Sequence, residues 1–155
     1  MTIDERLKEK GIELADPPVP TASYVPCVTV GNLVYVSGQG PVRDGKNVYE
    51  GTVGKDITPE EAQKAARLCG CNILAQMKKH LGSLERIKRI VNLKGYVACT
   101  DDFKGQAVVV NGASDLMKEV LGDNGAHTRC ALGTNSLPTG IPVEVEAVFE
   151  IYEQR

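Results

Sequence analysis

The residues from Thr58 to Gly82, TPEEAQKAARLCGCNILAQMKKHLG, are a strong indication of the fold class. It begins with a threonine that can cap a helix, a proline at the first helical position and a carboxylate three residues after the threonine. Apolar residues then recur at helical spacing up to the terminating Gly82, at Ala62, Ala65, Ala66, Cys69, Ile73, Leu74, Met77 and Leu81. We predict a long amphipathic helix with one face in the core.

Toward the N-terminus, two runs rich in β-forming residues, 24–30 and 33–37, are separated by Gly31-Asn32. A two-residue turn of this kind closes a hairpin, so both runs are predicted strands. A short strand is expected near 48–53. Further upstream, Thr2 to Glu5 form a capping box for a short helix, and Pro17, Pro18 and Pro20 make an extended leader.

Toward the C-terminus, the pattern predicts a strand over 87–99 and a second helix that opens at Asp101-Asp102 and ends at Gly122. Two strands follow, over 128–133 and 143–152, and we expect them to form a hairpin. The order is hairpin, helix, strand, helix, hairpin, which predicts an α+β fold with a mixed sheet. Right-handed crossovers place both helices on one face, so self-association is expected to cover the other.

The 155 residues are expected to form a single domain, 1–155, in which 1–20 are the N-terminal helix and the leader. A net charge of −2 with interleaved signs makes a nucleic-acid partner unlikely. The apolar runs are far shorter than the ~20 residues that a membrane span needs. The charged N-terminus is unlike a signal peptide, so a cytoplasmic location is expected. The five cysteines are interpreted as small buried hydrophobic residues, and no metal or cofactor is expected.

Two charged residues in predicted strands are the candidates for chemistry. Arg129 lies in an apolar strand, where its guanidinium needs an anion. Glu144 and Glu146 share one face of the last strand, because alternate side chains of a strand point the same way. If this strand pairs with the Arg129 strand, a carboxylate lies beside the guanidinium. A structural ion pair between Arg129 and Glu144 at a subunit contact is the alternative.

Several segments of the chain resemble the YjgF/RidA family, in order and nearly in spacing. The N-terminal part has G-N-x-x-x-x-S-G-Q over 31–39, after Tyr24-Val25. The C-terminal part has R-x7-L-P-x5-E-x-E-A over 129–147, and Asn111 lies between the two motifs. The resemblance covers about 24–152 and is closest to a longer branch known as endoribonuclease L-PSP. It implies a chorismate-mutase-like fold and a homotrimer whose sheets form a central barrel, with ligand clefts at the subunit boundaries.

The resemblance also implies an activity, the hydrolysis of 2-aminoacrylate and other 2-imino acids to 2-keto acids and ammonia. Arg129 would bind the substrate carboxylate, with the backbone amide of Ala131 as a second donor, and Glu144 would position or activate the attacking water. Tyr24, Ser37 and Asn111 would line the cleft. The chain departs from the usual pattern at Ala131, where the family has cysteine, and at Ser114, where it has an aromatic residue.

Other interpretations remain open for these residues and for the activity. Tyr24 could be a core aromatic, Ser37-Gly38 a strand end, Asn111 a structural hydrogen-bonding residue and Cys130 inert packing. The chain could be a non-catalytic trimer that binds a small carboxylate, or an endoribonuclease or translation inhibitor. The acidic balance and the absence of interleaved aromatic and basic residues argue against RNA.

Overall fold

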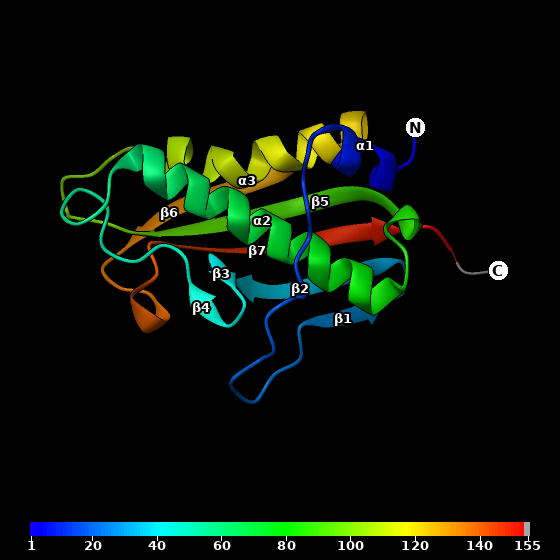
Figure 1. The fold of residues 1–155 in the computed structure, drawn as a ribbon, viewed down its shortest axis with the longest axis horizontal. Helices are drawn as coiled ribbons and strands as arrows, with labels where there is room; N and C mark the ends of the chain where they lie inside the picture. The colour runs from blue at the N-terminus through cyan, green and yellow to red at the C-terminus, as the bar shows by residue number, and fades with distance from the viewer. Residues whose placement is uncertain (154–155) are drawn as a thin grey trace.

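The structure is a computed structural model that describes residues 1–153. Its helices and strands follow the predicted alternation of the chain (Figure 1). In order they are α1 (Ile3–Glu9), β1 (Cys27–Val30), β2 (Leu33–Gln39), β3 (Val42–Arg43), β4 (Lys46–Asn47), α2 (Pro59–Leu81), β5 (Ile87–Ala98), α3 (Gln106–Leu121), β6 (Thr128–Thr134) and β7 (Val143–Ile151). Short 3-10 helices, η1, η2 and η3, lie at Leu84–Arg86, Gly122–Gly125 and Pro138–Gly140. None of the helices within 1–153 is both long and apolar enough to cross a membrane.

Five strands form one mixed sheet in the order β1-β2-β7-β5-β6. The β5–β6 pair is parallel and the other neighbours are antiparallel. The predicted α+β class and the β1–β2 hairpin are confirmed, but the predicted hairpin of the last two strands is wrong. The loop after β6 steps across the end of β5, where the Ala98 amide donates to the Pro142 carbonyl, so β7 enters on the far side of β5.

Helices α2 and α3 pack side by side on the same face of the sheet, as predicted (Figure 1). Their apolar faces are fully buried against the inward residues of β5 and β7, such as Leu93 and Phe149. Glycines allow the two helices to approach closely. A Cβ at Gly112 of α3 would lie 2.0 Å from the Gln63 carbonyl oxygen of α2, so only glycine fits there.

The ends of α1 and α2 match the sequence signals. Thr2 and Glu5 form the reciprocal capping box of α1, and Thr58 caps α2 by accepting from the Glu61 amide. Gly82 ends α2 in the left-handed conformation. These ends follow from local chemistry, because each cap satisfies backbone groups that the helix leaves without partners.

Two elements differ from the prediction. Helix α3 does not begin at Asp101-Asp102, because the Asp102 carboxylate accepts from the Thr100 hydroxyl in a preceding turn, and the helix starts at Gln106. The strand expected over 48–53 is also wrong. The chain instead forms the short β3–β4 hairpin, and Val53 makes only isolated bridges to Ile57 and Cys99.

The face of the sheet opposite the helices is not covered by a helix of the described chain (Figure 1). Large apolar side chains remain exposed on it, at Val28, Val30, Tyr35 and Leu132. Cys130 is exposed there as well, so the expectation that it is buried is wrong, whereas Cys69 is buried and Cys27, Cys71 and Cys99 are partly buried against the core. An exposed apolar sheet face of this kind is typical of a protein interface.

The contact between α2 and α3 generates a test of the fold. Gly112→Ala should lower the free energy of unfolding by about 1–3 kcal/mol, because the added methyl forces two backbones apart. Gly70→Ala is the matched control. Its Cβ would meet the end of the Leu116 side chain, which can move, so the loss should be smaller. Urea denaturation measures both, and a Gly112→Ala protein more stable than the parent would contradict the packing.

Candidate functional site

Arg129 lies on β6, at the edge of the sheet, and its side chain faces the helices. Its backbone is in register with the buried Leu93 of β5. Its Nη1 donates to Asn111 Oδ1 at 2.7 Å and to Ser114 Oγ at 3.2 Å, and its Nη2 donates to the Ala107 carbonyl at 3.4 Å. All three acceptors belong to α3. Asn111 is therefore a partner of Arg129, which supports the structural reading of this residue.

The charge of Arg129 is not neutralised by any carboxylate within residues 1–153, where no ion pair includes it. Its three partners are all uncharged, and the side chain is partly exposed. A guanidinium has five N–H donors, so Nε–H and one N–H of Nη2 remain for a ligand. Nε and Nη2 flank one edge of the planar group, and such an edge can hold a carboxylate through two parallel hydrogen bonds.

Glu144 does not lie beside Arg129, so that prediction is wrong within one chain. Strand β5 separates β6 from β7, and the two side chains lie on opposite faces of the sheet. The alternation in β7 places Val143 and Val145 in the core and Glu144 on the other face. Sequence alone could not order the strands, because the same alternation suits a strand beside either neighbour.

The Glu144 carboxylate is partly buried against the backbone of β2. A Cβ on Gly38 would lie 2.8 Å from Glu144 Oε2, so glycine permits this close approach. Burial raises the pKa of Glu144 above its ordinary 4.5, and the negative charge of Glu146 raises it further. Glu146 itself accepts from the Tyr96 hydroxyl at 2.9 Å. The environment of Glu144 thus favours the protonated acid more than water does.

Glu144 and Tyr24 line the same cavity, which has a volume of about 600 Å³. The proline-rich leader forms one wall, and the β3–β4 hairpin and η3 supply the others. Tyr24 is 49% exposed, so the reading of this residue as a core aromatic is wrong. Cavities of this volume are of the size that holds small molecules. We call this space the glutamate cavity.

Two buried amides hold the leader against the glutamate cavity. Gln76 of α2 donates from Nε2 to the Pro18 carbonyl at 2.8 Å and to Gln39 Oε1 at 3.2 Å. Gln39 in turn donates to the Ser37 carbonyl. Because both amides are almost fully buried, these bonds fix the position of the cavity wall.

Ser37 is tied to the chain just before β1. Its hydroxyl donates to the Val25 carbonyl at 2.7 Å, and its amide donates to the Pro26 carbonyl at 2.8 Å. It lines a neighbouring hollow of about 250 Å³ together with Glu146, and not the glutamate cavity. Ala131 lies on β6, two residues after Arg129, where the edge strand pairs only with β5 in the described sheet.

The sequence reading did not assign a role to Ser114 or His127, which lie behind Arg129. Ser114 is only 4% exposed, and its hydroxyl contacts both Arg129 and His127. The spacing could have indicated Ser114, because residues three apart on a helix share a face and Ser114 therefore lies beside Asn111. His127 precedes the Arg129 strand by one residue, which places it at the same end of the sheet.

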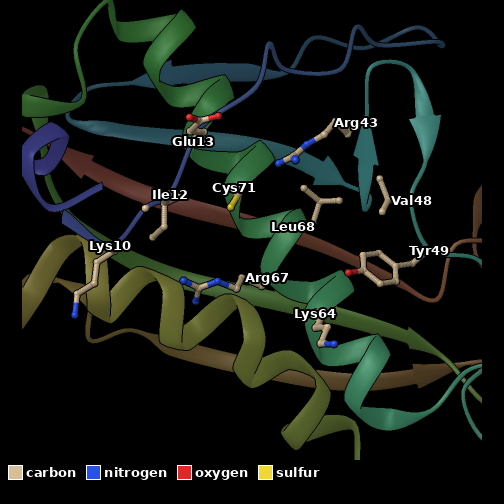
Figure 2. A pocket seen from close by; sticks show the side chains of 11 residues that line it. Lys10, Ile12, Glu13, Arg43, Val48, Tyr49, Lys64, Arg67, Leu68 and Cys71 are labelled. Atoms are coloured by element: carbon tan, nitrogen blue, oxygen red, sulfur yellow. The ribbon is translucent and has the colours of Figure 1, made fainter. Parts of the chain in front are cut away.

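A further cavity of about 480 Å³ lies over the outer surface of α2, away from these residues. Arg43 and Tyr49 line it from the β3–β4 region, and Leu68 and Cys71 line it from the helix (Figure 2). The Arg67 guanidinium points toward α3, where Glu119 binds it at 2.9 Å (Figure 2). Burial raises the pKa of the Cys71 thiol, so this thiol is not an activated nucleophile.

Comparison with known proteins identifies the relatives of this chain. The model of a family described as "YjgF/chorismate mutase-like, putative endoribonuclease" matches residues 4–148. "Protein TCP17" of Trypanosoma cruzi is 41% identical over 146 residues, which cover 94% of this chain and 91% of the relative.

Two solved structures share most of the fold. Atu1372 of Agrobacterium tumefaciens is 47% identical, with a TM-score of 0.90 over 97% of this chain and 92% of that one. A protein of Shewanella oneidensis described as a "putative endoribonuclease" is 33% identical, with a TM-score of 0.94 over 97% of this chain and 100% of that one. On the family match and these likenesses, the chain belongs to the YjgF/chorismate-mutase-like family.

Proposed function

We propose that this protein is an imine and enamine deaminase that hydrolyses 2-aminoacrylate and related 2-imino acids to 2-keto acids and ammonia. The observation that carries the proposal is the guanidinium of Arg129, which is held by uncharged partners and retains two N–H donors. A substrate carboxylate supplies the missing negative charge. Such substrates arise as by-products of pyridoxal-phosphate enzymes, which fits a cytoplasmic role.

We also propose that three copies assemble through the bare face of the sheet, with the sheets around a central barrel. The exposed apolar residues on that face support this arrangement. The active site then forms at each boundary between two copies, where the Arg129 edge of one copy meets the glutamate cavity of the next. This accounts for the separation of Arg129 and Glu144 within one chain.

The reaction needs one general base and a means of holding the substrate. Arg129 binds the carboxylate, and the amide of Ala131 adds a second donor. Glu144 accepts a proton from water as the oxygen bonds to the imine carbon and the C=N electron pair moves to nitrogen. The proton then passes to that nitrogen, which becomes an amino group on the carbon that now carries the hydroxyl. Glu144 next takes the hydroxyl proton and passes it to the amino group, so ammonia leaves as the C=O bond of the keto acid forms. Positioning lowers much of the barrier, because an imine carbon is already electrophilic.

The remaining residues shape the site in this proposal. Asn111 orients Arg129 through its 2.7 Å bond, and Tyr24 closes one side of the glutamate cavity. Ser37 fixes the chain before β1, next to that cavity. None of these roles requires a metal ion or an organic cofactor.

Two other activities are separated from deamination by simple assays. Binding of a 2-keto acid without turnover of imine would identify a non-catalytic carboxylate-binding trimer. The name of the Shewanella relative raises RNA cleavage as the other activity. With a net charge of −2 we expect no salt-dependent RNA binding, because such binding rests on clustered basic residues.

Arg129→Lys should lower kcat/KM for enzymatically generated 2-aminoacrylate by about 100-fold. Lysine keeps the charge but lacks the planar edge that holds both carboxylate oxygens. The measurement is the rate of keto-acid release above the spontaneous rate. Arg67→Lys is the matched control, because Arg67 pairs with Glu119 on the outer helix surface. Equal activity in the parent and the Arg129→Lys variant would contradict the proposal.

The acidic limb of the pH dependence of kcat/KM should report the ionisation of Glu144. Its pKa is raised above 4.5, so the base form and kcat/KM should increase as pH rises through a midpoint above that value. Glu146→Gln removes a neighbouring negative charge, and the midpoint should therefore move to lower pH. Glu144→Gln should abolish most activity. It should not lower the free energy of unfolding at pH 7, because burial disfavours the carboxylate that it replaces.

If the midpoint of the acidic limb is the same in the parent and in Glu146→Gln, Glu144 is not the titrating base. A Glu144→Gln variant that retains the parent activity would lead to the same conclusion. Glu50→Gln offers a control, because this carboxylate lies outside the glutamate cavity and should leave the profile unchanged.

A further inference from the structure

We infer that Ser114 and His127 are positioning residues for Arg129, joined to it by a hydrogen-bond chain that runs in one direction and ends on the Gly125 carbonyl. The inference rests on the proposed function, in which Arg129 binds the substrate carboxylate. It adds two residues that do not touch the substrate. Ser114 is almost fully buried, behind the guanidinium.

The residues at the two ends of this hydrogen-bond chain fix which groups donate and which accept. His127 Nδ1 lies 2.7 Å from the Gly125 carbonyl oxygen, which can only accept, so Nδ1 carries a hydrogen. At the other end, Arg129 Nη1 can only donate, so the Ser114 oxygen accepts from it at 3.2 Å. The Ser114 hydroxyl hydrogen is then free to point at His127 Nε2, which lies 2.8 Å away.

These contacts select one tautomer of the neutral His127 ring. A neutral ring with its hydrogen on Nδ1 leaves a lone pair on Nε2 for the Ser114 hydroxyl. Each donor in the series Arg129, Ser114, His127 then has an acceptor, and aligned bonds of this kind strengthen one another.

The Gly125 end of the hydrogen-bond chain is packed tightly against α3. A Cβ on Gly125 would lie 2.5 Å from the Met117 carbonyl oxygen and 2.7 Å from Lys118 Cα, so η2 packs directly against the backbone of α3. Both Ser114 and the anchor of His127 are therefore fixed to the same helix that supplies Asn111. The consequence is that Nη1 is held by two acceptors, while Nε–H and one N–H of Nη2 make no hydrogen bond within the described residues and remain for the ligand.

Nuclear magnetic resonance of the ring nitrogens tests the chain directly. The protein has only two histidines, so His80→Gln assigns the His127 signals. We expect neutral His127 to carry its hydrogen on Nδ1. A hydrogen on Nε2 would contradict the proposed hydrogen-bond chain. This measurement uses the free protein and does not depend on any activity.

Ser114→Ala tests the positioning role. Pyruvate, the keto acid that 2-aminoacrylate yields, should bind the variant about tenfold more weakly than the parent, since one hydrogen bond to a charged group is lost. His127→Gln should weaken binding as well, and His80→Gln is its matched control. Ser114→Thr keeps the hydroxyl and should bind pyruvate more tightly than Ser114→Ala. Unchanged affinity in a folded Ser114→Ala protein would overturn the inference.

Failure of the inference and failure of the proposed function give different results. If the parent protein binds no keto acid and deaminates no imine, the proposed function fails. The nuclear magnetic resonance signals of the Arg129 guanidinium N–H groups then test the positioning role. They should broaden in Ser114→Ala relative to the parent, and identical signals in the two proteins would overturn it.

Discussion

Helices α2 and α3 are in close contact, and the placement of several other elements follows from it. Gly112 brings the two helix backbones together, which places both helices side by side on one face of the sheet. Asn111 and Ser114 lie next to this glycine along α3, so the packing also fixes where they meet β6. The same packing leaves the opposite face bare. The position of Arg129 and the exposure of the sheet thus have one common cause.

Two charged groups are left in environments that do not satisfy them within a single chain. Arg129 is surrounded by uncharged acceptors, and Glu144 is partly buried beside another carboxylate, which raises its pKa. Neither charge gains an opposite charge within the described chain in return for the hydration that it loses. A carboxylate with a raised pKa, such as Glu144, is frequent at functional sites. The separation of Arg129 and Glu144 by β5 makes a site shared between copies an economical explanation.

The glutamate cavity depends on a part of the chain that has little regular structure. The leader has three prolines and forms no helix or strand, yet the buried amides of Gln76 and Gln39 hold it in place. Only neutral groups make these contacts, while the carboxylates of Asp16 and Asp44 also line the cavity beside Glu144. The cavity over α2, by contrast, has its Arg67 bound by Glu119, and the requirement for an anion is weaker there.

The local elements of this protein could be predicted from the amino-acid sequence. The caps at Thr2 and Thr58, the turn at Gly31-Asn32 and the stop at Gly82 depend on neighbouring residues, so they could be predicted from spacing. The motif around Arg129 and Glu144 likewise identified the family. Helix α3 starts later than predicted, because the Thr100 hydroxyl donates to Asp102 in a turn that competes with the helix.

The order of the strands in the sheet could not be predicted, because apolar and polar residues alternate along β7 in the same way whichever strand pairs with it. The packing of the whole molecule sets that order. It placed β5 between the two charged strands and so put Arg129 and Glu144 on opposite faces. It also brought His127 to Ser114, a contact between a loop and a helix that no local pattern encodes. Long-range pairing of this kind is set by how the whole core packs.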